Sequence, residues 1–210
     1  MLFKNISILD EDLQRKENQY VGIKGTQIAY IGTEKPKEDF GKEYEGKGKL
    51  LMSGFVNAHA HSPMTLLRGY GENLALQQWL NEKIFPFEAK LDEEKVYWGT
   101  LLAMAESLRY GIVSTSDMYY FCDAMVKAVI ESGAKTNLSR AIANFSEENL
   151  MDIPSGKEAE ALYQAYHQGE DGRIKIDMAL HAEYTSTPKI VEQLAEYTAG
   201  IGANMQVHLS

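Results

Sequence analysis

Beyond residue 50 the chain alternates between short apolar runs of strand length and longer segments with helical periodicity. This alternation limits the fold more than any other feature of the sequence. The predicted strands are residues 51–58, 112–118, 135–142, 173–181 and 203–209. The predicted helices are residues 92–110, 122–132, 155–168 and 188–200. Strands joined by helices pair in parallel, so the pattern predicts an α/β fold. It fits either a doubly wound sheet or part of a (β/α)8 barrel.

Two of the predicted helices have clear start signals. Asp92 precedes Glu93 and Glu94, which would face the positive end of the helix dipole. Thr187 followed by Pro188 is a favourable pair for the N-cap and the first helical position. We therefore expect helices to begin directly after Asp92 and Thr187.

The first 50 residues have a different pattern. Three β-branched or aromatic runs predict strands at residues 2–9, 19–24 and 27–32. Gly25 and Thr26 between the last two indicate a two-residue hairpin. Residues 35–49, rich in Lys, Glu and Gly, are expected to form a linker with at most one edge strand. We predict a small β domain at 1–50 and a second domain at 51–210.

Charge and cysteine content exclude several classes of protein. The chain has 21 basic and 30 acidic side chains, a net charge of −9, and no basic cluster, so nucleic acid is not an expected partner. The single cysteine, Cys122, cannot form an internal disulfide. The N-terminus lacks the pattern of a signal peptide, and no apolar run approaches the roughly 18 residues of a membrane span. We expect a cytoplasmic protein without membrane contact.

Histidines mark the ends of the predicted strands. In GFVNAHAHS, strand alternation places Asn57, His59 and His61 on one face, at the carboxyl end where barrel enzymes build active sites. His181 and His208 end two later strands. A His-x-His pair alone is weak evidence and also occurs without a ligand. Four strand-end histidines together predict a metal or catalytic site.

Four segments of the chain resemble one known family. The segments are GFVNAHAHSPMTLLRGYGENLALQQWL, FPFEAKL, HAEYTSTP and VHLS. They are similar to the amidohydrolase superfamily, in particular to its branch of 5′-methylthioadenosine/S-adenosylhomocysteine deaminases and chlorohydrolases. The resemblance covers nearly the whole chain. It implies a metal-dependent (β/α)8 TIM barrel, of which about five β/α units are present, with a small N-terminal portion of a β-sandwich.

The resemblance also implies a metal centre. One divalent ion would be bound by His59, His61 and His208, with an aspartate from the eighth strand. Zinc is the expected ion and iron the alternative. Three imidazoles and a carboxylate leave a position for water, whose pKa the metal lowers from 15.7 towards about 7. Hydroxide would then attack the ring carbon that carries the exocyclic amine.

Four further residues gain a role only through the resemblance. Glu88 would accept hydrogen bonds from ribose hydroxyls, His181 and Arg140 would contact the substrate, and Trp79 would line the pocket for the base or thioether. Taken alone, Trp79 is equally typical of a core position, and Glu88 of a solvated loop. Arg140 would simply pair with a carboxylate.

The sequence departs from the family pattern at several points. The histidine after the sixth strand and the aspartate after the eighth strand are absent. The proton-transferring glutamate is expected three residues after the third histidine, at position 211, and the sequence ends at Ser210. No catalytic acid is therefore expected within residues 1–210, and we expect this part alone to be inactive. A second basic residue for the homocysteine carboxylate is missing unless Lys157 serves, which puts S-adenosylhomocysteine in doubt.

The expected function is hydrolytic deamination of an adenosine-type nucleoside, a small-molecule substrate. Guanine, cytosine or triazine aminohydrolase or chlorohydrolase activity is the alternative within the superfamily. A non-catalytic remnant that serves as a binding or assembly subunit is the alternative from another class. The exact substrate, the metal and the assembly into a homo-oligomer stay open at this point.

Overall fold

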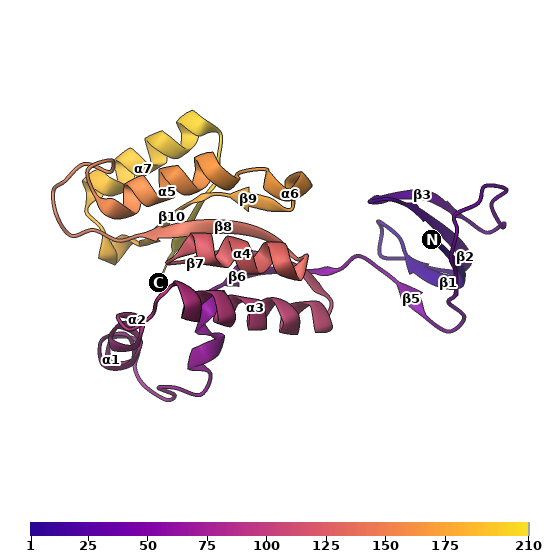
Figure 1. Cartoon of the computed structure of the whole chain (residues 1–210), viewed down its shortest axis with the longest axis horizontal. Coiled ribbons are helices and arrows are strands. Elements are labelled where there is room, and N and C mark those ends of the chain that lie inside the picture. Colours follow the sequence, from indigo (N-terminus) through magenta and orange to yellow (C-terminus); the bar gives the residue numbers. More distant parts are fainter. Residues whose placement is uncertain (210) are drawn as a thin grey trace. The chain divides into compact units, whose positions relative to one another are not determined.

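A computed structural model describes residues 1–209, so Ser210 of the predicted second domain lies outside the described residues. The chain forms two compact units, Met1–Gly54 and Phe55–Ser210 (Figure 1). Each unit has its own sheet. None of the helices in the described part of the chain combines the length and the apolar character that crossing a membrane requires.

The first unit is a mixed five-stranded sheet in the order β3-β2-β1-β4, with β5 also paired to β1. Its strands are β1 (Leu2–Leu9), β2 (Arg15–Lys24), β3 (Gln27–Gly32), β4 (Glu43–Glu45) and β5 (Leu50–Leu51). Lys24 pairs with Gln27 across the hairpin, whose Gly25 has a φ of 55°. The prediction began β2 at residue 19, which is wrong, because pairing of Arg15 with Leu9 extends this polar strand.

The second unit contains a parallel sheet in the order β11-β10-β8-β7-β6, with β9 also paired to β8. Its strands are β6 (Phe55–Ala60), β7 (Ile112–Tyr119), β8 (Lys135–Ile142), β9 (Ile174–Ile176), β10 (Met178–Ala182) and β11 (Met205–His208). The parallel order of successive strands agrees with the βα pattern of the sequence.

Two predicted strands are divided in the structure. The run 51–58 splits at Gly54, because Leu50–Leu51 pairs with β1 of the first sheet whereas Phe55 begins the second sheet. The run 173–181 splits at Asp177, whose carboxylate accepts hydrogen bonds from Asn137 and Asn204. Single continuous strands were therefore the wrong prediction in both places.

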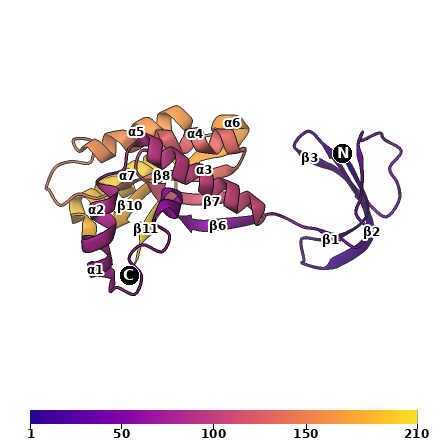
Figure 2. The ribbon, with the colours of Figure 1, turned by 60° about the horizontal axis from the view of Figure 1, so that its bottom comes forward.

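The helices of the second unit pack against the strands between which they lie in the sequence (Figure 2). They are α3 (Glu93–Arg109), α4 (Cys122–Ser132), α5 (Pro154–Tyr166), the short α6 (Gly169–Gly172) and α7 (Pro188–Ile201). The Asp92 side chain accepts the Lys95 N–H at 3.0 Å, and Thr187 Oγ1 accepts the Ile190 N–H at 3.4 Å. Both predicted N-caps are confirmed.

The connection between β6 and α3 contains several helical segments and forms one wall of the site described below. These segments are the 3-10 helix η1 (Ser62–Leu67), α1 (Leu76–Trp79), the π-helical turn η2 (Leu80–Ile84) and α2 (Phe85–Glu88). After β10 comes the 3-10 turn η3 (Glu183–Thr185).

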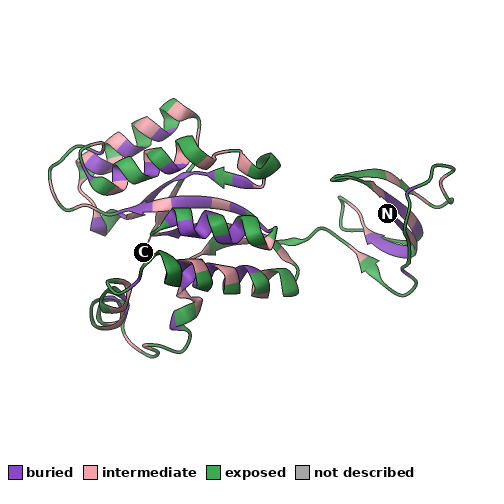
Figure 3. Ribbon diagram, in the orientation of Figure 1, coloured by how far each residue is buried: buried purple, intermediate pink, exposed green. Residues whose placement is uncertain are grey.

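The core of the second unit lies between the sheet and the helices. Buried residues form stripes along the sheet-facing sides of the helices and along the central strands (Figure 3). In the first unit a small cluster of Ile6, Ile8 and Val21 plays the same part. Burial of these apolar side chains is the main source of folding free energy.

We expect Leu138→Ala to lower the free energy of unfolding by about 2 to 5 kcal/mol. Leu138 is fully buried on β8, so truncation leaves a cavity as well as lost apolar burial. Leu102→Ala is the matched control, because Leu102 on α3 is 45% exposed and its truncation is expected to cost less than about 0.5 kcal/mol. Urea unfolding followed by circular dichroism measures both. Equal losses would contradict the placement of Leu138.

Candidate metal centre

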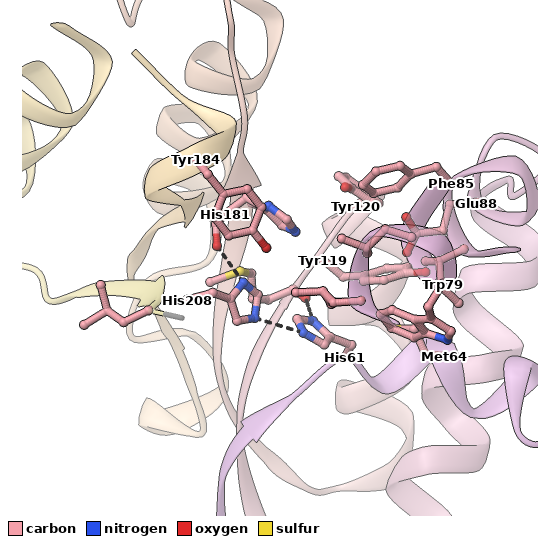
Figure 4. Close-up of a pocket in the computed structure, with 16 residues that line it drawn as sticks. His61, Met64, Trp79, Phe85, Glu88, Tyr119, Tyr120, His181, Tyr184 and His208 are labelled. Atoms are coloured by element: carbon pink, nitrogen blue, oxygen red, sulfur yellow. Dashed lines mark hydrogen bonds between the residues drawn. The ribbon is translucent and has the colours of Figure 1, made fainter. Parts of the chain in front are cut away.

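Three histidine rings from distant parts of the sequence meet at one end of the parallel sheet. His59 lies near the end of β6, His61 directly follows that strand, and His208 ends β11. His208 Nε2 lies 3.1 Å from His59 Nε2 and 3.2 Å from His61 Nε2 (Figure 4 shows the second pair). Among residues 1–209 these three form the group of His, Cys, Asp and Glu side chains that could hold a metal ion.

The hydrogen bonds of the Nδ1 atoms of His61 and His208 determine the tautomers of the two rings. His61 Nδ1 lies 2.6 Å from the Met118 carbonyl, and His208 Nδ1 lies 2.5 Å from the His181 carbonyl. A carbonyl only accepts, so each Nδ1 carries the proton and each Nε2 keeps a free lone pair. Two nitrogens bound to one tetrahedral zinc at about 2.0 to 2.1 Å lie about 3.3 Å apart. The donor set therefore fits a metal ion.

The electrostatics also favour neutral, metal-binding imidazoles. Burial lowers the pKa of His61, the hydrogen bond to the Met118 carbonyl partly offsets this, and the neighbouring His208 lowers it again. Burial, followed by His61 and His208, lowers the pKa of His59. Neutral imidazole is the form that binds zinc. The three histidines could hold one divalent metal ion at neutral pH.

A buried aspartate lies next to this group and was missed by the sequence analysis. Asp117 on β7 is 1% exposed, and its Oδ1 accepts the N–H of Ser62 at 3.2 Å. Its Oδ2 is buried without a hydrogen-bond partner among the described residues. The available signal was an acid inside the otherwise uncharged strand STSDMYY. Aspartate is rarely fully buried unless its carboxylate is paired.

A cavity of about 280 Å³ opens beside the histidines (Figure 4). Its walls are mostly apolar and aromatic, and its polar groups are few, as is usual for small-molecule sites. His61 and His208 lie at one side, and the segment from α1 to α2 forms the opposite wall. Lining residues from that wall are Leu76, Trp79, Leu80, Ile84, Phe85 and Glu88.

Glu88 and Trp79 both line this cavity. The π-helical turn between them places an extra residue in the helix, a feature frequent at functional sites. Burial raises the pKa of Glu88, and the hydroxyl of Tyr119, towards which the carboxylate lies in Figure 4, lowers it. Glu88 is thus a half-buried cavity carboxylate. Trp79 also packs against a small apolar cluster around Leu80, so it is both a core and a cavity residue.

His181 lines the same cavity. Its Nδ1 lies 3.1 Å from Thr185 Oγ1. Burial, followed by His208 and His61, lowers the pKa of His181 to about 4, so the ring is neutral at pH 7. A neutral ring offers one N–H donor and one acceptor to whatever occupies the cavity.

Arg140 lies in an adjoining cavity of about 660 Å³, which shares Phe85, Glu88 and Tyr120 with the first. Its Nε donates to Glu158 at 2.6 Å, and its guanidinium lies 5.0 Å from the centre of the Tyr120 ring. Lys157 lines neither cavity, and its ammonium donates to the Asp152 carbonyl. Arg140 is therefore paired with the Glu158 carboxylate, and Lys157 does not lie beside it as a second basic residue.

Comparison with known proteins gives three kinds of match. The model of the amidohydrolase family matches residues 50–210. A 5-methylthioadenosine/S-adenosylhomocysteine deaminase of Dictyoglomus turgidum is 38% identical over 211 residues, covering 100% of this chain and 48% of the relative. A 5′-deoxyadenosine deaminase of Methanobrevibacter smithii is 38% identical over 192 residues, covering 90% of this chain and 43% of the relative. The chain thus spans about half the length of these curated relatives.

Solved structures give similar coverage. An adenosine deaminase from Xanthomonas campestris with bound zinc is 26% identical, with a TM-score of 0.84, over 99% of this chain and 48% of that one. An atrazine chlorohydrolase from Arthrobacter aurescens, complexed with zinc, has a TM-score of 0.89 at 17% identity over 100% of this chain and 52% of that one. At that identity the second match shows the fold alone. It confirms the predicted fold class, an α/β fold with part of a parallel barrel.

Proposed function

Since the chain belongs to the amidohydrolase family, we propose that the whole protein hydrolytically deaminates an adenosine-type nucleoside at a metal ion held by His59, His61 and His208. The observation that carries the proposal is the convergence of three imidazole nitrogens beside a cavity that also contains Glu88. The curated relatives bear the names of deaminases of such nucleosides. We also propose that the first unit is part of a β-sandwich domain. The proposed location of the protein is the cytoplasm.

Zinc is the proposed ion, with iron as the alternative. Three neutral nitrogen ligands suit zinc, and the relative from Xanthomonas campestris was solved with zinc bound. When bound, the ion supplies a water molecule of lowered pKa at neutral pH. The carboxylic acid that moves the proton to departing ammonia is expected at position 211, which follows the described residues.

The cavity residues would divide the recognition of the substrate. Glu88 would accept hydrogen bonds from the ribose hydroxyls, and the flat indole of Trp79 would pack against the base or the 5′-thioether. The neutral ring of His181 would contact the purine from the side of the metal centre. Each of these groups faces the same cavity, so one nucleoside could contact all three.

Arg140 would contact the 5′ side of the nucleoside from the adjoining cavity. A ligand with its ribose at Glu88 has this cavity next to it, because Glu88 lines both. Arg140 is already paired with Glu158, so a carboxylate tail would have to compete for the guanidinium. We therefore propose 5′-methylthioadenosine, with its uncharged 5′ group, as a better substrate than S-adenosylhomocysteine.

Assays on the full-length, zinc-loaded protein test this proposal. We expect the absorbance shift from adenosine-type to inosine-type base and one ammonia per nucleoside, with 5′-methylthioadenosine faster than S-adenosylhomocysteine. Turnover of guanine, cytosine or a triazine without turnover of nucleosides would replace the proposal by the other activity of the family. A protein that binds metal but converts none of these would instead be a binding or assembly subunit.

A further inference from the structure

Asp117 is a buried acidic residue for which the proposed reaction has no role. Its side chain lies inside the second unit, and the described residues place no Lys or Arg in an ion pair with it. Among residues 1–209, one of its oxygens has a single N–H donor and the other has none. A buried carboxylate with so few partners is costly, so its presence calls for an explanation.

The contacts of Asp117 lead directly to the metal ligands. Its Oδ1 accepts the N–H of Ser62, the residue after His61, at 3.2 Å. The next residue along β7, Met118, accepts the Nδ1 proton of His61 at 2.6 Å. Two consecutive residues of β7 thus hold the two residues that directly follow β6. Ala60, the last residue of β6, lies between the two ligand histidines and is the register partner of Asp117.

Asp117 is thus linked to the ligand His61 through the neighbouring residue Ser62. Burial raises the pKa of Asp117, and the carboxyl group can accept the Ser62 N–H in either protonation state. Groups that fix the orientation of metal ligands tune the affinity of the site for the metal.

We propose that Asp117 is a positioning residue of the metal centre, which holds the turn that carries His61 through its hydrogen bond with the Ser62 N–H. This inference rests on the proposed metal centre. Asp117 does not line the cavity beside the histidines, so its role involves no contact with the substrate.

Two replacements test this contact. Asp117→Asn keeps an oxygen that can accept the Ser62 N–H, and Asp117→Ala removes it. Asp177→Asn is the matched control, since Asp177 is also buried and bonded to backbone and amide groups, but it lies at the break between β9 and β10. Competition with a chelator measures zinc affinity, and the absorption spectrum of the cobalt form reports ligand geometry without an assay of activity.

We expect Asp117→Ala to weaken zinc binding about 10- to 100-fold and to alter the cobalt spectrum. Asp117→Asn should keep most of the zinc affinity and the wild-type cobalt spectrum, and Asp177→Asn should keep the wild-type zinc affinity. Zinc affinity of Asp117→Ala close to that of the wild type would overturn the inference, as would an equal loss in Asp117→Asn. If the wild-type protein itself takes up no stoichiometric metal, the proposed function fails instead.

Discussion

Replacing both His59 and His61 by alanine is expected to lower the bound metal from about one ion per chain to background. Ammonia release should fall by more than about 10³-fold, because the activated water and the electrostatic stabilisation of the transition state both depend on the metal. Two of the three converging nitrogens are lost, and the imidazole of His208 with one carboxylate from the eighth strand does not retain a zinc ion against water and chelator.

Elemental analysis and the ammonia assay on the same preparation check this result. His167→Ala is the matched control, because this histidine stacks on Tyr163 and contacts Ile176 away from the metal centre. The control should keep its metal even if its thermal stability falls. Normal metal content in the double variant would show that His59 and His61 are not the metal ligands.

Replacing Glu88 by glutamine should reduce kcat/KM for adenosine-type nucleosides by roughly 10- to 150-fold, the equivalent of a lost charge-assisted hydrogen bond of about 1.5 to 3 kcal/mol. The same change should have little effect on the corresponding 2′,3′-dideoxynucleosides, which lack the ribose hydroxyls that Glu88 would bind. The difference between the two substrates isolates the interaction with ribose from any general effect on the cavity.

The comparison needs a control from the same helical segment. Glu82 lies on the π-helical turn, is exposed, and accepts a hydrogen bond from Gln78 rather than facing the cavity. Glu82→Gln should leave both substrates unaffected. An equal loss for ribosyl and dideoxy substrates in Glu88→Gln would mean that Glu88 supports the wall of the cavity instead of binding ribose.

Most of the secondary structure was predictable because its causes are local. The strand β8 and the helix that begins after Asp92 follow from side-chain periodicity and a capping carboxylate a few residues away. The errors fall where pairing with a distant strand decides the outcome. Leu50–Leu51 leaves the strand predicted at 51–58 for the first sheet, and Asp177 interrupts an apolar run because its carboxylate is held by Asn137 and Asn204.

The site shows the same division. Alternation along β6 and the position of His208 at a strand end predicted histidines at one edge of the sheet. The family resemblance was needed to single out Glu88, which the structure places in the cavity. No local sequence signal distinguished Arg140. Its guanidinium is already paired with Glu158, which only the tertiary structure shows.

By itself, the sequence determined the alternation of strands and helices, the N-caps and the chemical types of the candidate ligands, since each depends on residues within a few positions of one another. Only the tertiary structure decided that His59 and His208, separated by 149 positions, turn their Nε2 atoms towards each other at 3.1 Å. It also decided that Asp117 is buried next to Ser62, with one oxygen that has no partner in the described part of the chain. Both results depend on which strands pair and in what register, and that choice minimises the free energy of the whole packed unit rather than that of any segment.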